Sequence, residues 1–406
     1  MNNEVGYENF PKVSNPQWIL FREVEAQILK QKVLKLQAQD FDALALEIFR
    51  FQAEHNLVYQ QYLQCLHIQI DSVKTIEQIP FLPIEFFKTQ TVITGENIIK
   101  TTFESSGTTG QIPSRHHVAD PDFYLEIAEQ IFEKTYGKLA DFHILALLPS
   151  YLERTNSSLV YMVEHFIKKS NNPNSGFFLN DYEKLARVLE TPNPQPLKPK
   201  TLLIGVTFGL LDFAESNSDL SFLKDRKDLI VMETGGMKGR RKELLREEVH
   251  EILTNAFHVE NIHSEYGMTE LLSQGYSSGE GIFDLPVSMK ILFRDVNDPF
   301  SYVQNARSGG INVIDLANID SCCFVETKDL GAMVNDELLV VNYESDGLPL
   351  SVSSQTTSTS VVCGDTDNGN SMNAVVCGDT DNGNNKFKIL GRFDNSDIRG
   401  CNLMIS

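Results

Sequence analysis

Apolar runs of strand length alternate with helical patterns through the middle of this sequence, and this alternation constrains the fold more strongly than any other feature. The strand-like runs span 143–148, 201–207 and 228–232, and the helical patterns span 156–168, 181–189 and 241–256. Strands that alternate with helices pack as a sheet covered by helices. The sequence therefore predicts an α/β core.

The regions on either side of this core have different patterns. Helical periodicity covers residues 16–75 and starts at Pro16, with apolar residues at three- and four-residue steps (Ile19, Leu20, Val24, Ile28 and Leu29). Short strands with few helices follow residue 282, at 288–293, 310–316, 322–326, 337–343 and 386–390. We expect an N-terminal helical segment and a small antiparallel sheet or distorted β-barrel that closes the site.

A chain of 406 residues exceeds one ordinary hydrophobic core, so two or three subdomains are expected. The predicted parts are an N-terminal helical segment (1–100), an α/β core with the phosphate loop (101–281), a β-rich subdomain (282–390) and a short hinge with the C-terminal tail (391–406).

The β-rich part contains a low-complexity insertion, residues 351–385. Within it, the ten residues from Val361 to Asn370 recur unchanged at 375–384. Two copies are too few for a solenoid. The Asp-x-Asp-Asn-Gly-Asn pattern resembles the start of a calcium loop but lacks the glutamate at the twelfth position, so a turn-rich excursion between strands is the preferred interpretation. A local duplication and a foreign insertion both remain open as its origin.

Charge and cysteine content narrow the class of protein. With 35 basic and 55 acidic residues the net charge is −20, which argues against nucleic acid or an anionic membrane as the main partner. The longest apolar run, Leu202–Leu211, is too short to span a bilayer, and no secretory leader pattern begins the chain. Six cysteines are too sparse for a disulfide scaffold. We expect a cytoplasmic enzyme with reduced thiols.

Hydroxyl residues and glycines alternate in the loop Ser105, Ser106, Gly107, Thr108, Thr109 and Gly110. Backbone N–H groups and hydroxyls can converge there on a polyanion, and glycine lets the main chain approach closely. The loop lacks the Gly-Lys-Ser/Thr of the common P-loop, and a surface turn is its alternative interpretation. Asp120-Pro121 follows as a predicted helix N-cap and first turn.

Two further motifs accompany this loop. A short predicted strand, 261–265, leads into Tyr266-Gly267-Met268-Thr269-Glu270, and ligands bind at such carboxyl ends in open α/β sheets. Gly391-Arg392-Phe393-Asp394 stands near the C-terminus.

The order of these motifs, with Asp329-Leu330-Gly331 between the last two, resembles the adenylate-forming superfamily. Within it the sequence is most similar to the acyl-protein synthetases of bacterial luminescence, the LuxE-like family. The residues that carry this closer resemblance are Phe81–Lys88, the phosphate loop with Ser114-Arg115-His116, Leu148–Arg154, Glu265–Gln274 and Ile398–Met404. It runs from about residue 80 to 331 and resumes at 387–406.

The resemblance implies a reaction. A carboxylic acid, in this family a fatty acid, reacts with ATP in the presence of Mg²⁺, pyrophosphate leaves, and the acyl group passes to a thiol. It also implies the fold of the large N-terminal domain of adenylate-forming enzymes, which has two layered α/β subdomains and a small distorted β-barrel. It allows for an acyl-accepting or reductase partner protein.

The resemblance also assigns roles to particular residues. The phosphate loop would hold the triphosphate, Glu270 the Mg²⁺ and Thr269 the α-phosphate. Tyr266, with its neighbours Glu265 and Gly267, would lie against the adenine, and Gly235-Gly236 against the other side of the base. Asp329 would accept hydrogen bonds from the ribose hydroxyls, and Arg392 would contact the ribose or phosphate. His116, with His263 as a second candidate, would position the carboxylate.

Each of these residues also has an ordinary structural interpretation. Glu270 could complement a helix dipole, Tyr266 could be a core tyrosine and Asp329 a turn former. A buried histidine is more often a satisfied structural residue than a catalytic one. Only the order of the motifs favours the functional interpretation.

The chain departs from the wider superfamily in two places. Ser114-Arg115 replaces the usual Pro-Lys-Gly, and the sequence ends twelve residues after Asp394, where full-length relatives continue into a lid domain with a catalytic lysine. Acyl-protein synthetases instead use a cysteine near their own C-terminus, and Cys401 occupies that place. Nearby arginines would favour its thiolate. The alternative is a small residue on a terminal strand.

Three hypotheses follow. The first is an acyl-protein synthetase that transfers the acyl group to Cys401. The second is an adenylating subunit that passes it to coenzyme A or a carrier protein. The third is a degenerate nucleotide-binding protein without turnover.

Overall fold

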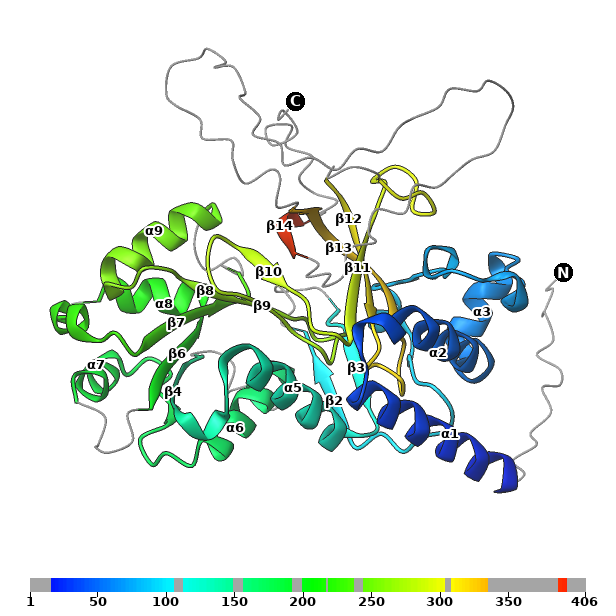
Figure 1. Ribbon diagram of the computed structural model, residues 1–406, viewed down its shortest axis with the longest axis horizontal. Helices are drawn as coiled ribbons and strands as arrows, with labels where there is room; N and C mark the ends of the chain where they lie inside the picture. The colour runs from blue at the N-terminus through cyan, green and yellow to red at the C-terminus, as the bar shows by residue number, and fades with distance from the viewer. Residues whose placement is uncertain are drawn as a thin grey trace, which may run out of the picture.

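The computed structural model describes residues 16–105, 112–148, 156–191, 199–216, 218–236, 244–303, 308–334 and 386–392, with backbone alone for 16–22 and 392. Its described strands form one large mixed sheet and a separate hairpin. Figure 1 shows helices α5 to α9 packed around one end of the large sheet and α1 to α3 beside the other end. The predicted α/β class is confirmed.

One half of the sheet is parallel and contains the alternation seen in the sequence. Its strands, in the order β8-β7-β6-β4-β5, pair in parallel throughout. They are β4 (Phe142–Leu147), β5 (Gly176–Phe177), β6 (Lys200–Val206), β7 (Leu229–Thr234) and β8 (His263–Tyr266). Every residue of β4 is buried, because helices cover both faces of a parallel sheet and leave no polar side.

The helices of this half include those that the sequence predicts and one, α8, that it does not predict. They are α5 (Pro121–Tyr136), α6 (Ser158–Ser170), α7 (Tyr182–Glu190), α8 (Thr207–Ala214) and α9 (Arg246–Phe257). The N-cap of α5 is confirmed, since the Asp120 carboxylate accepts a hydrogen bond from the backbone N–H of Phe123. The apolar run predicted to end at 207 ends one residue earlier, because Thr207 already begins α8.

The other half of the sheet is mostly antiparallel and continues from β8 through β9 and β10. Its strands are β9 (Gly275–Ser277), β10 (Ile282–Asp284), β11 (Met289–Arg294), β12 (Gly309–Asp315), β13 (Phe324–Met333) and β14 (Lys386–Arg392), and β1 (Leu82–Pro83) pairs in parallel with β13. The expected short strands beyond residue 282 are confirmed where they are described; 337–343 and 351–385 lie outside the described residues. A closed barrel stays a prediction, as does the division into four parts.

The N-terminal helical segment is confirmed, but the buried face of its first helix differs from the expected one. The helices are α1 (Pro16–Leu34), α2 (Phe41–His55), α3 (Leu57–Cys65) and α4 (Phe86–Thr89), with 3-10 turns η1 (Ala38–Asp40), η2 (Ile70–Ser72) and η3 (Ile76–Gln78). Two further 3-10 turns, η4 (Leu139–Asp141) and η5 (Ser221–Asp225), lie in the parallel half. Leu29 is buried as expected, whereas Val24 and Ile28 are 49% and 52% exposed. The side of α1 that faces the core instead carries Ala26, Lys30 and Val33.

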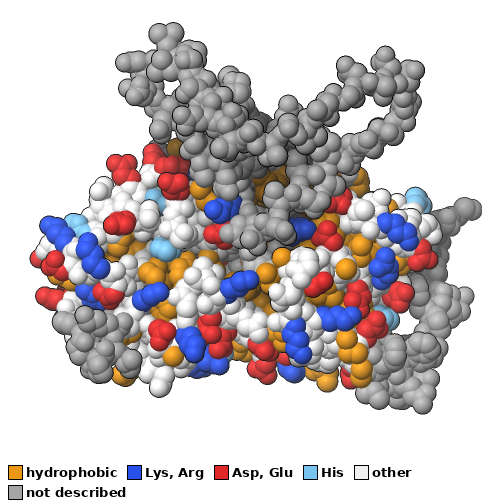
Figure 2. Space-filling view, in the orientation of Figure 1, with side chains coloured by type: hydrophobic (Ala, Val, Ile, Leu, Met, Phe, Trp, Pro, Cys, Tyr) orange, Lys and Arg blue, Asp and Glu red, His pale blue; other side chains and the backbone are white. Residues whose placement is uncertain are grey.

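The distribution of charged side chains and the burial of two cysteines can be compared with what the composition predicts. Figure 2 shows acidic and basic side chains interspersed over the visible face. Among the described helices, none is both long enough and apolar enough to cross a membrane. Cys322 and Cys323 are buried free thiols, and burial raises the pKa of Cys322 to about 12. These two cysteines are therefore core residues, as a small apolar side chain in such a run would be.

Candidate functional site

The predicted phosphate loop is the tip of a two-stranded hairpin formed by β2 (Thr101–Glu104) and β3 (Arg115–Val118). Ser105 and Ser114 close its base: the Ser105 N–H donates to the Ser114 carbonyl over 3.0 Å, and the Ser114 N–H donates to Ser105 Oγ over 2.9 Å. Residues 106–111, which include Ser106, Gly107, Thr108, Thr109 and Gly110, lie outside the described residues. Their role in binding phosphate stays a prediction. The hairpin whose two strands they connect is fully paired from Thr101 to Glu104.

His116 connects this hairpin to the second motif. It is 1% exposed, and its Nδ1 lies 2.8 Å from the carbonyl oxygen of Thr269. A carbonyl oxygen only accepts, so Nδ1 carries the proton and donates. Burial lowers the pKa of His116 to about 4, although the bond to Thr269 opposes this shift. The imidazole is therefore neutral near pH 7 and serves as a hydrogen-bond donor.

The turn formed by Thr269 and Glu270 follows β8 and is held on its other side by the connection between β12 and β13. Glu270 is 4% exposed, and its carbonyl accepts a bond of 2.8 Å from Asn318 Nδ2. Two backbone N–H groups just beyond it, those of Leu272 and Ser273, donate to the Asp315 carboxylate at 2.7 and 2.9 Å. The backbone on both sides of Glu270 is thus fixed by buried side chains.

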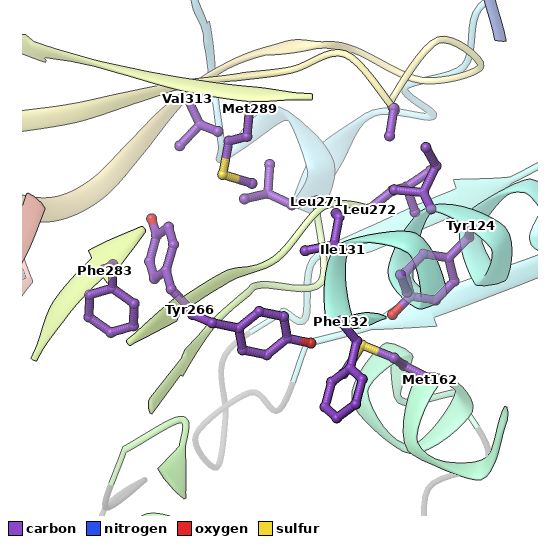
Figure 3. Close-up of a cluster of buried hydrophobic side chains, with 14 of the residues drawn as sticks. Tyr124, Ile131, Phe132, Met162, Tyr266, Leu271, Leu272, Phe283, Met289 and Val313 are labelled. Atoms are coloured by element: carbon purple, nitrogen blue, oxygen red, sulfur yellow. The ribbon is translucent and has the colours of Figure 1, made fainter. Parts of the chain in front are cut away.

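Apolar side chains anchor the same segment. Figure 3 shows Leu271 and Leu272 between Met289 and Val313 on one side and Ile131 of α5 on the other. Leu271 and Leu272 are 2% and 5% exposed. Because both leucines are buried, the turn before them cannot shift without opening the core.

Glu265 and Gly267 depend on each other sterically. The Glu265 carboxylate accepts a hydrogen bond from the Thr234 hydroxyl on the paired strand β7. A Cβ placed on Gly267 would collide with Oε1 of that carboxylate. Glycine is therefore required at 267 for as long as Glu265 keeps this position.

Tyr266 and Asp329 are joined directly, although they come from different halves of the sheet. The Tyr266 hydroxyl donates to Asp329 Oδ2 over 3.1 Å, and Asp329 pairs with Arg392 in the β13–β14 ladder. The Tyr266 ring packs edge-on against Phe283 and Phe387, with centroids 6.0 and 5.6 Å apart. Three residues predicted to contact one nucleotide are thus neighbours, and Tyr266 is a core residue as well. Asp329 lies within a strand, so its interpretation as a turn former is wrong.

Gly235 and Gly236 form the turn after β7, as expected. Gly235 has φ +69°, a conformation that favours glycine, and a Cβ on Gly236 would meet no atom of the described residues within 4 Å. The Thr207 hydroxyl lies 2.9 Å from the Gly235 carbonyl oxygen and 2.8 Å from Glu233 Oε2. The backbone of this turn is therefore exposed, and the Thr207 hydroxyl holds the Gly235 carbonyl in place.

Glu233 is a buried carboxylate that sequence reasoning missed. Burial alone would raise its pKa, but the nearby His250 and Arg246 outweigh this and hold the pKa below its usual range. Asp315 and Asn318 were missed as well. The available signal was a single polar residue at the end of an apolar run, in Ile-Val-Met-Glu and in Val-Ile-Asp-Leu.

The other predicted site residues are separated from this centre or lie outside the described residues. His263 begins β8, at the end opposite Tyr266, and its Nδ1 lies 3.1 Å from the Tyr136 hydroxyl. This distance from the carboxyl end of the sheet argues against contact with the substrate. Cys401 lies beyond the described residues, and of Arg392 only the backbone is described.

A metal at this site would need ligands besides protein. In the described part of the chain, no group of three or more His, Cys, Asp or Glu residues could hold a metal ion. Mg²⁺ is commonly held by one or two carboxylates with phosphate oxygens and water, so a single carboxylate such as Glu270 fits this donor set.

One hollow in the described part of the chain lies away from this centre. It measures about 1100 Å³, its lining includes α1, α2 and residues 97–100, and none of the predicted site residues lines it. This hollow is therefore not the predicted nucleotide site.

Comparison with known proteins adds a family and a fold. A sequence model of the family described as "Acyl-protein synthetase, LuxE" matches residues 12–343. The sequence matches no curated protein.

Two solved structures of 2-hydroxyisobutyryl-CoA ligase are similar in fold. An open conformation with 2-HIB-AMP and CoA has a TM-score of 0.55 at 14% identity and covers 74% of this chain and 67% of that one. The thioesterification state has a TM-score of 0.54 at 14% identity and covers 83% and 71%. At this identity the likeness shows the fold, that of the large domain of adenylate-forming ligases.

Proposed function

This chain belongs to the LuxE acyl-protein synthetase family, and we propose that it uses ATP to activate a carboxylic acid, a fatty acid by family resemblance, before the acyl group passes to a protein cysteine. Family membership supports acyl-adenylate formation and acyl transfer in general. The acid, the acceptor and the individual residue roles are our proposals.

The observation that carries the proposal is the bond between Tyr266 and Asp329. It joins two of the motifs whose order suggested nucleotide binding, and the register of β13 and β14 adds Arg392 opposite Asp329. A structural role alone does not require motifs from separate halves of the sheet to meet beside the Gly235 turn. A bound adenosine would use all of them at once.

In the first step, a carboxylate oxygen of the acid attacks the α-phosphorus of ATP. The bond from that phosphorus to the bridging oxygen of pyrophosphate breaks, and an acyl adenylate forms. Two anions must approach each other, so the site must hold the triphosphate and neutralise the charge that develops. We assign the first task to the 105–110 hairpin loop and the second to the Thr269–Glu270 turn.

Within that turn, Thr269 would donate to the α-phosphate and Glu270 would hold Mg²⁺. The metal, when bound, neutralises phosphate charge as pyrophosphate leaves. A fixed backbone supports these roles, because preorganised groups need no reorganisation during the reaction. His116 is neutral and its Nδ1 is bonded to Thr269, so a role in holding this turn is better supported than direct action on the carboxylate.

In the second step, a thiolate attacks the acyl carbon, the bond to AMP breaks, and a thioester remains. Two of the described cysteines are poor acceptors, because Cys322 and Cys323 are buried and burial raises the pKa of both thiols. Cys65, on α3, is exposed and serves as the control below. We propose Cys401 as the acceptor because it occupies the place of the family's C-terminal cysteine.

Acid-dependent exchange of labelled pyrophosphate into ATP, over a panel of acids, tests the first step. A labelled fatty acid tests the second: the label should stay on denatured protein and be released by neutral hydroxylamine, as a thioester requires. Cys401→Ser should lose this label but keep the exchange, while Cys65→Ser, the matched control, should keep both. Exchange without any protein label would favour coenzyme A or a carrier protein as acceptor, and no exchange with any acid would contradict the proposal.

A further inference from the structure

The Thr269–Glu270 turn is held in an unusual way. Its two successive carbonyls each accept a hydrogen bond from a buried side chain, and the two side chains come from different parts of the sequence. His116 of β3 reaches the first carbonyl, and Asn318, between β12 and β13, reaches the second, both at 2.8 Å. Asn318 is 0% exposed and His116 is 1% exposed.

Both donors are themselves held in place. Gln52 of α2 is buried, and its Nε2 lies 2.9 Å from the carbonyl oxygen of Asn318 and 3.1 Å from that of Ser321. Its Oε1 accepts from the Cys323 N–H at 2.9 Å. The His116 ring packs edge-on against Phe87, with centroids 5.8 Å apart. Neither donor can follow the turn if the turn moves.

We propose that His116 and Asn318 are positioning residues that clamp the backbone of Thr269 and Glu270, so that these two side chains face the reacting phosphate. The inference rests on the function proposed above for that turn. It also gives the N-terminal helices a part in the reaction, because Gln52 of α2 donates a hydrogen bond to the backbone carbonyl of Asn318. His116 then acts through its N–H and transfers no proton.

The clamp has a physical reason. A buried carbonyl without a partner is costly, so loss of one donor would make the turn move toward another donor or toward water. A displacement of about 1 Å at a reacting group can cost on the order of 100-fold in rate. Binding of ATP depends on many other contacts, so the effect should appear in kcat more than in KM.

The first test compares two substitutions of His116. Asn places an amide nitrogen where the imidazole has Nδ1, so His116→Asn should keep kcat for pyrophosphate exchange within about threefold. His116→Leu removes the donor and should lower kcat about 10- to 100-fold, with KM for ATP within about threefold. The matched control is His117→Leu. That neighbour on β3 is bonded to Thr102 and not to the turn, so its kcat should not change.

The second test does not need activity. Backbone hydrogen exchange of a peptide covering 268–274 should become faster in His116→Leu and in Asn318→Ala and stay unchanged in His116→Asn. If His116→Leu does not fold, Asn318→Ala carries both measurements.

The clamp is overturned by wild-type kcat in a folded His116→Leu protein, by an equal loss in His116→Asn, or by unchanged hydrogen exchange in Asn318→Ala. Absence of acid-dependent exchange in the wild type would instead overturn the proposed function, and the hydrogen-exchange result would still decide whether the clamp exists.

Discussion

The turns after the neighbouring strands β7 and β8 are built in opposite ways. The turn at Gly235 and Gly236 is open, has a positive φ and is supported by one side chain, Thr207. The turn at Thr269 and Glu270 has a buried Glu270 and a half-buried Thr269, and it is held from both sides. In the proposed site, the first turn would present exposed backbone to a flat ligand, and glycine adopts φ +69° without strain. The second would present the side chains of Thr269 and Glu270, whose positions depend on the backbone that holds them.

Removal of the Glu270 carboxylate should give the largest effect. Full activity without it would contradict the view that this turn acts through its side chains. We expect Glu270→Ala to lower pyrophosphate exchange about 100- to 1000-fold, because the carboxylate meets charge that develops during the reaction. Glu270→Gln, which keeps the size, should be nearly as inactive. A thermal melt of both variants is the control, since a large fall in Tm would mean that the loss reflects unfolding.

The pH dependence of the free energy of unfolding should report on His116, the buried donor to the Thr269 carbonyl. The folded pKa of His116 is about 4, below its ordinary value of 6.5, so the unfolded chain binds a proton first. This histidine therefore costs no stability above about pH 6.5, and the cost grows to about 3 kcal/mol as the pH falls to about 4.

Urea unfolding of His116→Asn at pH 7 and pH 4.5 tests this. The loss of stability between the two pH values should be smaller in the variant than in the wild type. His117→Asn is the control, because its partly buried ring has a smaller effect to remove. An equal pH dependence in His116→Asn and the wild type would mean that His116 titrates normally.

The open turn offers a matched pair of smaller effects. Gly235→Ala places a Cβ at φ +69° and should destabilise the protein by about 1–2 kcal/mol. Gly236→Ala adds a methyl group where no described atom lies within 4 Å and should leave stability within about 0.5 kcal/mol. Both should raise KM for ATP if the base lies against this turn. Equal stability of the two variants would show that the strain does not reside at 235.

Deletion of 351–385 should give the smallest effect. The segment is rich in Asn, Asp, Gly, Ser and Thr and poor in large apolar residues, so it can bury little surface, and loop length costs little entropy. Stability and pyrophosphate exchange of the shortened protein should match the wild type. Insoluble protein on deletion would show that the repeat supports the fold.

The sequence alone predicted the α/β class and most elements of the parallel half, though not β5 or α8, because strand and helix periodicities are local. It also indicated the family, since each motif is a short local string and the order of the motifs can be read without a structure. It did not predict the buried face of α1: Val24 and Ile28 are exposed, because the packing of neighbouring elements decides which face of a helix is covered.

The contacts that make a site were decided by the tertiary structure. Tyr266 and Asp329 are 63 residues apart in sequence, His116 and Thr269 are 153 apart, and Glu270 and Asn318 are 48 apart. No periodicity connects such pairs. Their meeting depends on the register of β13 with β14 and on the packing of the β2–β3 hairpin against the Thr269–Glu270 turn. It also depends on Gln52 of α2, which contacts the backbone of Asn318. All three follow from how the whole core packs.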